Sequence, residues 1–159
     1  MGNAYLYRMP SGIPGDVSRK SQSTIEAHFL GGQFAAYGLF GKLDSSGNFS
    51  PLVSSDTAVY GLLVRAYPTQ SASNAQGTAT PAASGFADVL RRGYMTVTCN
   101  AGTAVKGAQV YVRVANGTTQ KPIGGIEAVA DGANTIAPAG VIFMSAADAS
   151  GNVEISYNI

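Results

Sequence analysis

Val110-Tyr111-Val112-Arg113-Val114-Ala115 is the stretch of this chain that decides its fold. Its three valines alternate with three other side chains, and the segment from Val153 to Ile159 repeats the same alternation. A period of two places one set of side chains on each face of a β-strand. Each segment therefore has one face to bury and one face that meets solvent or a partner.

Other segments predict strands by the same alternation, or as apolar runs between turn signals. They are residues 24–29, 34–40, 49–53, 60–67, 86–91, 94–99, 126–130, 141–144 and 152–159. The turn formers Asp44-Ser45-Ser46-Gly47-Asn48 and Asp148-Ala149-Ser150-Gly151 separate some of them. Arg92-Gly93 predicts a tight bend or bulge, and the best helix candidate is one turn near Thr103. The sequence predicts an all-β fold of roughly eight to ten strands, a compact β-barrel or β-sandwich.

Residues 1–23 differ in character from the rest of the chain. Their prolines and glycines prevent a helix from propagating, yet apolar and aromatic side chains are scattered among them. One interpretation is a disordered terminus. The preferred interpretation is an extended N-terminal arm that becomes ordered on another subunit. The chain then divides into an arm, residues 1–23, and a β-domain, residues 24–159. The β-domain has a long surface loop at about residues 69–84, which lacks large apolar side chains.

Composition limits the possible functions. Charged residues make up 12% of the chain and the mean hydropathy is +0.10, which is low in charge for a freely soluble monomer. We therefore expect part of the surface to be covered in the working state. The formal charge of +1 gives no global attraction to nucleic acid or to an anionic membrane. The N-terminus lacks the long apolar run of a signal peptide or membrane anchor, so we expect synthesis in a cytosol.

Candidate catalytic residues are few. His28 is the only histidine, which excludes a two-histidine metal site, and Cys99 is the only cysteine, which excludes an intrachain disulfide. A small hydrolase with Cys99 as nucleophile and His28 as base is the least favoured hypothesis, because no orienting residue or oxyanion loop can be named. The acidic residues are isolated and mostly lie in or beside expected turns. We expect no enzymatic activity, no cofactor and no metal.

Arg91, Arg92 and Tyr94 could form a small basic and aromatic patch for nucleic acid, but such a binder normally shows a basic overall balance. A subunit contact is the preferred interpretation, because Arg and Tyr are enriched at interface hot spots. The candidate contact residues of the whole chain are Tyr5, Tyr7, Met9, Ile13, Arg19, Arg91, Arg92 and Tyr94.

Several short sequence motifs follow one another along most of the chain from Met9 onward. They are Gly12-Ile13-Pro14-Gly15-Asp16-Val17-Ser18-Arg19, Tyr60-Gly61-Leu62-Leu63-Val64-Arg65, Pro68-Thr69-Gln70, Asp88-Val89-Leu90-Arg91-Arg92-Gly93-Tyr94-Met95, Val110-Tyr111-Val112-Arg113-Val114-Ala115-Asn116, Gly124-Gly125-Ile126-Glu127-Ala128 and Glu154-Ile155-Ser156-Tyr157-Asn158-Ile159. The number and the order of these motifs make the chain resemble the structural cement proteins of tailed-bacteriophage heads.

The resemblance implies a small β-rich protein that binds the outer surface of an icosahedral capsid and ties neighbouring major capsid subunits together. It implies no enzymatic activity and no cofactor. The expected partner is the major capsid protein, with the chain itself a homo-oligomer, dimer or trimer, on the capsid. The expected location is the outer surface of the virion, after synthesis in the host bacterial cytoplasm. The alternative is a glycan-binding adhesion module on a phage or cell surface, for which eight tyrosines could supply stacking surfaces.

Overall fold

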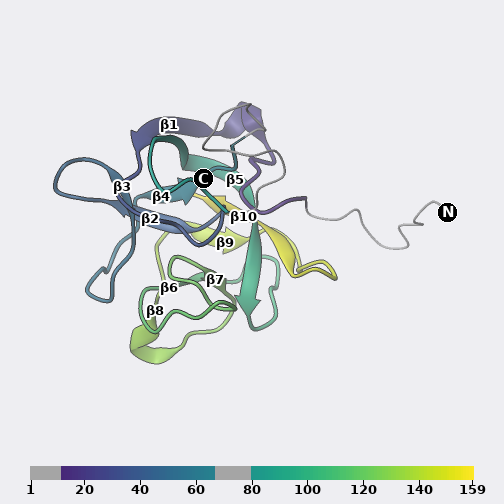
Figure 1. The fold of residues 1–159 in the computed structure, drawn as a ribbon. Coiled ribbons are helices and arrows are strands. Elements are labelled where there is room, and N and C mark those ends of the chain that lie inside the picture. The colour runs from purple at the N-terminus through teal and green to yellow at the C-terminus, as the bar shows by residue number, and fades with distance from the viewer. Residues whose placement is uncertain (1–11, 67–79) are drawn as a thin grey trace.

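Strands form nearly all of the regular structure in the computed structural model, which describes residues 12–66 and 80–159 (Figure 1). The strands are β1 (Thr24–Phe29), β2 (Phe40–Leu43), β3 (Phe49–Pro51), β4 (Gly61–Leu63), β5 (Phe86–Ala101), β6 (Tyr111–Arg113), β7 (Ile126–Glu127), β8 (Thr135–Ile136), β9 (Val141–Phe143) and β10 (Asn152–Tyr157). Two 3-10 helices, η1 (Lys20–Gln22) and η2 (Gly132–Asn134), complete the described elements. None of the described helices is long and apolar enough to span a membrane.

The sixteen-residue strand β5 organises the sheet. Its first half pairs antiparallel with β1 on one edge and with β4 on the other, and its second half pairs antiparallel with β10. Its last residues pair parallel with β7. Along the path β3-β2-β4-β5-β7-β6-β8 the sheet curls into a half-barrel, with β1 to β4 above and β6 to β8 below in Figure 1.

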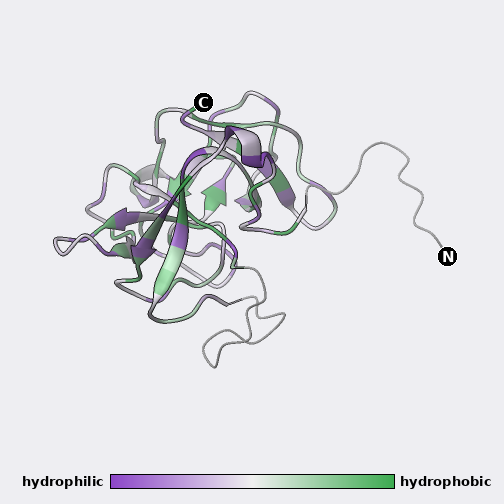
Figure 2. Ribbon diagram, turned by 90° about the horizontal axis from the view of Figure 1, so that it is seen from above, coloured by the Kyte–Doolittle hydropathy of each residue, from purple (hydrophilic) through white to green (hydrophobic). Residues whose placement is uncertain are grey.

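Two hydrophobic clusters fill the molecule, one on each face of β4 and β5. Leu62 and Leu90 point into the larger cluster, which continues to Phe143 and the other side chains of β6, β9 and β10. Leu63 and Val89, the neighbours of the first two, point into a smaller cluster with residues 30–49. Alternate side chains of β4 and β5 thus contribute to the two clusters. Seen from above, the strands carry both hydrophobic and hydrophilic stretches (Figure 2).

The all-β prediction is confirmed, and the irregularity expected at Arg92-Gly93 is a bulge that lies one residue earlier, at Arg91. Thr24 lies opposite Arg92 while Ile25 lies opposite Leu90, so one extra residue stands in β5 at Arg91. Gly93 follows with a φ of +136°, a backbone conformation that residues with a Cβ rarely adopt. The strand continues through the bulge and changes partners there, from β1 and β4 to β10.

Two local predictions are wrong. Residues 34–39 form no strand, because their apolar side chains enter the smaller cluster from an irregular segment that bends at Gly38, where φ is +78°. The helical turn expected near Thr103 is also absent; residues 103–105 have no regular secondary structure, and the chain turns at Lys106-Gly107. The long loop expected at about residues 69–84 lies mostly outside the described residues.

Part of the expected N-terminal arm packs on its own domain. Residues 15–18 run along β5, where Gly15 N donates to Thr96 O at 2.8 Å, Thr96 N donates to Asp16 O at 2.9 Å, and Ser18 N donates to Tyr94 O at 3.1 Å. A Pro- and Gly-rich segment can pack in this way because the strand satisfies its main-chain groups. Residues 1–11, the rest of that arm, lie outside the described residues.

Gly124 joins the two halves of the molecule. Its carbonyl accepts from Phe40 N at 2.9 Å, and its N–H donates to Arg113 O at 2.8 Å, so β2 and β6 meet through this one residue. Its φ is +80°, and a Cβ built on it would lie 2.2 Å from Phe40 O. Neither the conformation nor the space admits a side chain.

Gly124→Ala should therefore lower the free energy of unfolding by about 3 kcal/mol or more, from left-handed strain plus overpacking. Gly47→Ala is the matched control, since Gly47 has the same φ of +80° but nothing within 4 Å of its would-be Cβ. It should cost only the backbone strain, about 1–2 kcal/mol. Urea unfolding of both variants measures the difference, and equal losses would contradict the close contact between the two halves.

Candidate functional site

The predicted contact residues fall into three groups. Tyr5, Tyr7 and Met9 lie outside the described residues. Ile13 is 55% exposed, next to the start of the described chain. Arg19, Arg91, Arg92 and Tyr94 are all engaged with other parts of the same chain, at two separate places.

The first place is the junction of residues 18–19 with β10. Arg19 binds Glu154 through two hydrogen bonds, Nε to Oε1 at 3.1 Å and a terminal nitrogen to Oε2 at 2.8 Å. Ser18 Oγ donates to Glu154 Oε1 at 2.6 Å. The guanidinium also lies 4.0 Å from the centroid of the Tyr94 ring, so Tyr94 is buried beneath it. The structure thus brings Arg19 and Tyr94 together, as a clasp that holds residues 12–23 on the domain.

The electrostatics of this clasp favour the ionised carboxylate. Partial burial raises the pKa of Glu154, but the hydrogen bonds from Arg19 and Ser18 outweigh it and leave that pKa below its usual value. The clasp therefore persists at neutral pH and weakens only as the pH falls through this lowered pKa.

The second place is a polar cluster formed by side chains of β1 and β5 and by Tyr60, the residue before β4. Arg91 lies over the Tyr60 ring, 3.5 Å from its centroid, and its Nε is 3.4 Å from Glu26 Oε2. Tyr60 OH donates to the same oxygen at 2.7 Å, and His28 Nε2 lies 3.2 Å from it. The hydrogen bond from Tyr60 is the main cause of a lowered pKa of Glu26, with His28 second. Arg92 is separate, and its Nε donates to Asn158 O at 3.3 Å.

The pair required for the hydrolase hypothesis is not assembled. His28 pairs with Ala87 near the start of β5, whereas Cys99 lies twelve positions further along the same strand (99 − 87). The Cys99 thiol donates to Ala101 O at 3.4 Å, and burial raises the pKa of this thiol, which favours the unreactive protonated form. Across residues 12–66 and 80–159, no group of three or more His, Cys, Asp and Glu side chains is placed to hold a metal ion.

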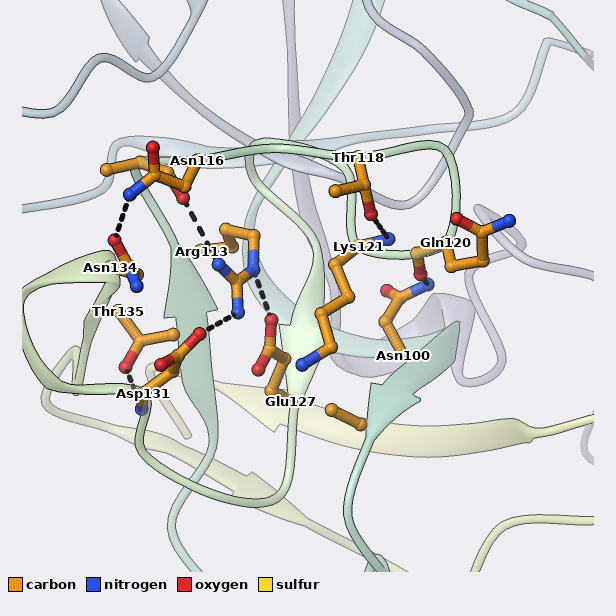
Figure 3. Close-up of polar contacts among 12 residues, drawn as sticks. Asn100, Arg113, Asn116, Thr118, Gln120, Lys121, Glu127, Asp131, Asn134 and Thr135 are labelled. Carbon is orange, nitrogen blue, oxygen red and sulfur yellow. Dashed lines mark hydrogen bonds and ion pairs between the residues drawn. The ribbon is translucent and has the colours of Figure 1, made fainter.

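The sequence analysis missed a buried charged network below β5. Arg113 Nε donates to Glu127 Oε1 at 2.5 Å, and another guanidinium nitrogen donates to Asp131 Oδ2 at 2.6 Å (Figure 3). Arg113 and Glu127 are 2% and 0% exposed. The hydrogen bond from Arg113 is also the main cause of a lowered pKa of Asp131. The valine strand was expected to turn Arg113 toward solvent or a partner, but the loops on both sides of β7 cover that face.

The network fixes these loops relative to β6. Arg113 also donates to Ala115 O at 3.2 Å, and Asn116 Nδ2 donates to Asn134 Oδ1 at 2.7 Å. Glu127 Oε2 is buried without a hydrogen-bond partner within the described chain. The other oxygen of this carboxylate forms the ion pair with Arg113. Because both side chains of the pair are almost completely buried, we assign it a structural role.

Arg113→Met should lower the free energy of unfolding by about 3–5 kcal/mol, because Glu127 would remain buried without its counter-charge. The double variant Arg113→Met/Glu127→Leu should recover most of this loss, because it removes both buried charges. Chemical denaturation of the wild type and of both variants provides the comparison. A single variant as stable as the wild type, or a double variant no better than the single, would contradict the assigned role.

Five exposed apolar side chains lie near the two ends of β5, and others, such as Val53 and Ile142, lie elsewhere. Ile25 is 43% exposed, Phe29 46% and Phe86 80%, and the two phenylalanines pack edge to face with centroids 5.0 Å apart. At the other end Val105 and Val129 are exposed in loops, Val129 beside Gly102. The sequence analysis predicted a strand at residues 24–29, but it could not identify what lies beside that strand.

Comparison with known proteins places this architecture among phage capsid proteins. The family model described as XM1 gp53 minor capsid protein matches residues 2–157. A chain in the solved structure "The capsid of Myoviridae Phage XM1" has a similar fold, with a TM-score of 0.74 and 22% sequence identity. The alignment covers 99% of this chain and 97% of that chain. No curated protein matches the sequence.

Proposed function

The chain belongs to the XM1 gp53 minor capsid protein family, and we propose that it acts as a cement protein on the outer surface of its phage capsid. As a minor capsid protein it is a structural component of the virion. The observation that carries the proposal is the family match over residues 2–157, nearly the whole chain. The partner is the major capsid protein, and the role is mechanical rather than enzymatic.

The distribution of exposed apolar side chains supports a bridging role. A cement protein must contact at least two neighbouring subunits, and this chain carries apolar side chains at both ends of β5, which runs from the upper to the lower part of the molecule (Figure 1). Val105 and Val129 supply the capsid contact at the lower end. The proposed arm, now limited to residues 1–11 with Tyr5, Tyr7 and Met9, supplies a second contact, and exposed Ile13 continues it.

Arg19, Arg91 and Tyr94 then have a different role from the one first expected. Each is engaged within the chain, where Arg19 covers Tyr94 and Arg91 covers Tyr60. We assign them to positioning the N-terminal segment and the polar cluster rather than to direct capsid contact. The hydrogen bond from Arg92 Nε to Asn158 O is long, at 3.3 Å. Arg92 therefore stays a proposed capsid contact.

Glycan binding is not proposed. A sugar face is usually held on a flat aromatic surface, and the most exposed aromatic pair in residues 12–66 and 80–159, Phe29 and Phe86, stands at an interplanar angle of 81°. The pair presents ring edges as well as faces and suits a protein contact better.

Truncation separates the arm from the domain. Deletion of residues 2–11 should leave the thermal unfolding of the domain nearly unchanged, because the clasp of Ser18 and Arg19 on Glu154 is retained, while binding to capsids weakens. Deletion of residues 2–18 should also destabilise the domain, since the hydrogen bonds of Gly15, Asp16 and Ser18 to β5 are lost. Calorimetry and a capsid co-sedimentation assay measure the two effects. If the variant that lacks residues 2–11 binds capsids as well as the wild type does, the arm is not part of the capsid contact.

Heating of particles tests the cement role itself. Binding that exists only in the assembled shell stabilises that shell by mass action, by about 2.7 kcal/mol per site at a hundredfold excess over the dissociation constant. Capsids stripped of the protein should therefore release DNA at a lower temperature than capsids to which it is added back. Equal release temperatures would refute the cement role.

The same titration tests the chemistry of the contact. With charged residues at only 12% of the chain, the contact should be mainly apolar and main-chain, and binding should survive moderate salt, which screens exposed charges. Dissociation on modest added salt would contradict the apolar contact while leaving the cement role intact.

A further inference from the structure

Asn116 and Gly117 form an exposed bend beside the buried network of Arg113. They are the only Asn-Gly pair in the sequence, and both residues are exposed. The φ of Asn116 is +51°, in the left-handed region, which asparagine adopts more readily than most residues with a Cβ. Because glycine has no Cβ, no side chain at position 117 shields the main-chain nitrogen from the side chain of Asn116.

The main-chain nitrogen of Gly117 is also free of hydrogen bonds. Within residues 12–66 and 80–159 no acceptor binds its N–H, so its movement toward the Asn116 side chain breaks no hydrogen bond of its own. The side-chain amide of Asn116 forms one hydrogen bond, in which its Nδ2 donates to Asn134 Oδ1 at 2.7 Å. This bond lies at the surface, where water can replace it.

We propose that Asn116 is a site of spontaneous deamidation in the folded protein, with water as the only co-reactant. Gly117 N attacks Asn116 Cγ, so that a new N–Cγ bond closes a succinimide ring and the Cγ–Nδ2 bond breaks. The amide nitrogen leaves as ammonia, with the proton that Gly117 N loses. Water then opens the ring at either of its carbonyl carbons, which leaves aspartate or isoaspartate at position 116.

Asn158 provides the comparison within the same chain. It is exposed, and it is the other non-glycine residue with a positive φ among the described residues, at +54°. Its side-chain amide also donates one hydrogen bond, from Nδ2 to Arg91 O at 3.1 Å. The residue that follows it, however, is Ile159, whose β-branched side chain crowds the main-chain nitrogen. We therefore expect Asn158 to keep its amide.

Deamidation breaks the contact between Asn116 and η2. Asn134 Oδ1 is an acceptor, and the carboxylate that replaces the amide accepts only. The Asn134 side chain also bonds Asp131, so it loses that bond if it turns its own amide nitrogen toward position 116. Asn134, which lies between Asn116 and Asp131 in Figure 3, then has a carboxylate on each side. Because a virion does not replace its proteins, the modified form accumulates as particles age.

Ageing of the purified full-length protein tests the site. Incubation under native conditions at mildly alkaline pH should produce a more acidic species on ion exchange, and peptide mass spectrometry should place the mass increase at Asn116 and not at Asn158. An isoaspartyl methyltransferase should label the same peptide. Asn116→Gln is the control variant, because its longer side chain forms the corresponding ring far more slowly. A folded protein that keeps the Asn116 amide over the time in which the protein in urea loses it, or that deamidates equally at Asn158, would overturn the proposal.

Substitution of Asn134 tests the restraint on the Asn116 amide. Asn134→Ala removes the acceptor of that amide, so it should accelerate deamidation at Asn116 several-fold. Asn158→Ala is the matched control, a change of the same kind away from this bend, and it should leave the rate at Asn116 unchanged. Thermal unfolding of each variant establishes that the domain is folded. An unchanged rate in Asn134→Ala would contradict the restraint.

The variant Asn116→Asp tests the consequence, because it reproduces one of the two products. It should unfold at a lower temperature than the wild type, since the hydrogen bond to Asn134 is lost and a second carboxylate lies beside that residue. The aged, more acidic species, separated by ion exchange, should show the same direction of change. Unfolding temperatures equal to that of the unmodified protein would show that the bend does not depend on the Asn116 amide.

Discussion

The pairing of β5 with four strands is the constraint on which the rest of this molecule depends. A strand is normally bonded along two edges to two neighbours, and β5 exceeds this only because its sixteen residues are used in succession. β1 and β4 hold the first part, β10 and residues 15–18 hold the middle, and β7 holds the end. The bulge at Arg91 and the backbone of Gly93 allow the strand to change direction between these partners.

Polar contacts fix loops and the N-terminal segment, which the two hydrophobic clusters alone do not hold in place. The short strands β6, β7 and β8 have two or three residues each, too few to fix long loops by ladder hydrogen bonds alone. The buried pair of Arg113 and Glu127 does so from inside, and Asp131 extends it to the surface. The clasp of Arg19 on Glu154 has the same role at the N-terminal segment, but it is more exposed and therefore weaker.

These features agree with a mechanical function. Few charges, a rigid curled sheet and exposed apolar residues at both ends suit a protein that forms contacts in an assembly. The proposed capsid contacts are the loops at the end of β5, with Val105 and Val129, together with residues 1–11.

Fold class, most strand positions and an irregularity near Arg92-Gly93 could be predicted from the sequence, because alternation and turn residues are local properties of the chain. The sequence also led to the phage capsid resemblance, through the order of motifs spread over the chain. The surroundings of Arg113, Arg19 and Tyr94 could not be predicted in this way, since a period of two tells which residues share a face but not what covers that face. The packing of residues 15–18 on β5 could not be predicted from the sequence either. Pairing partners are set by contacts between residues far apart in the chain, and local patterns carry no record of them.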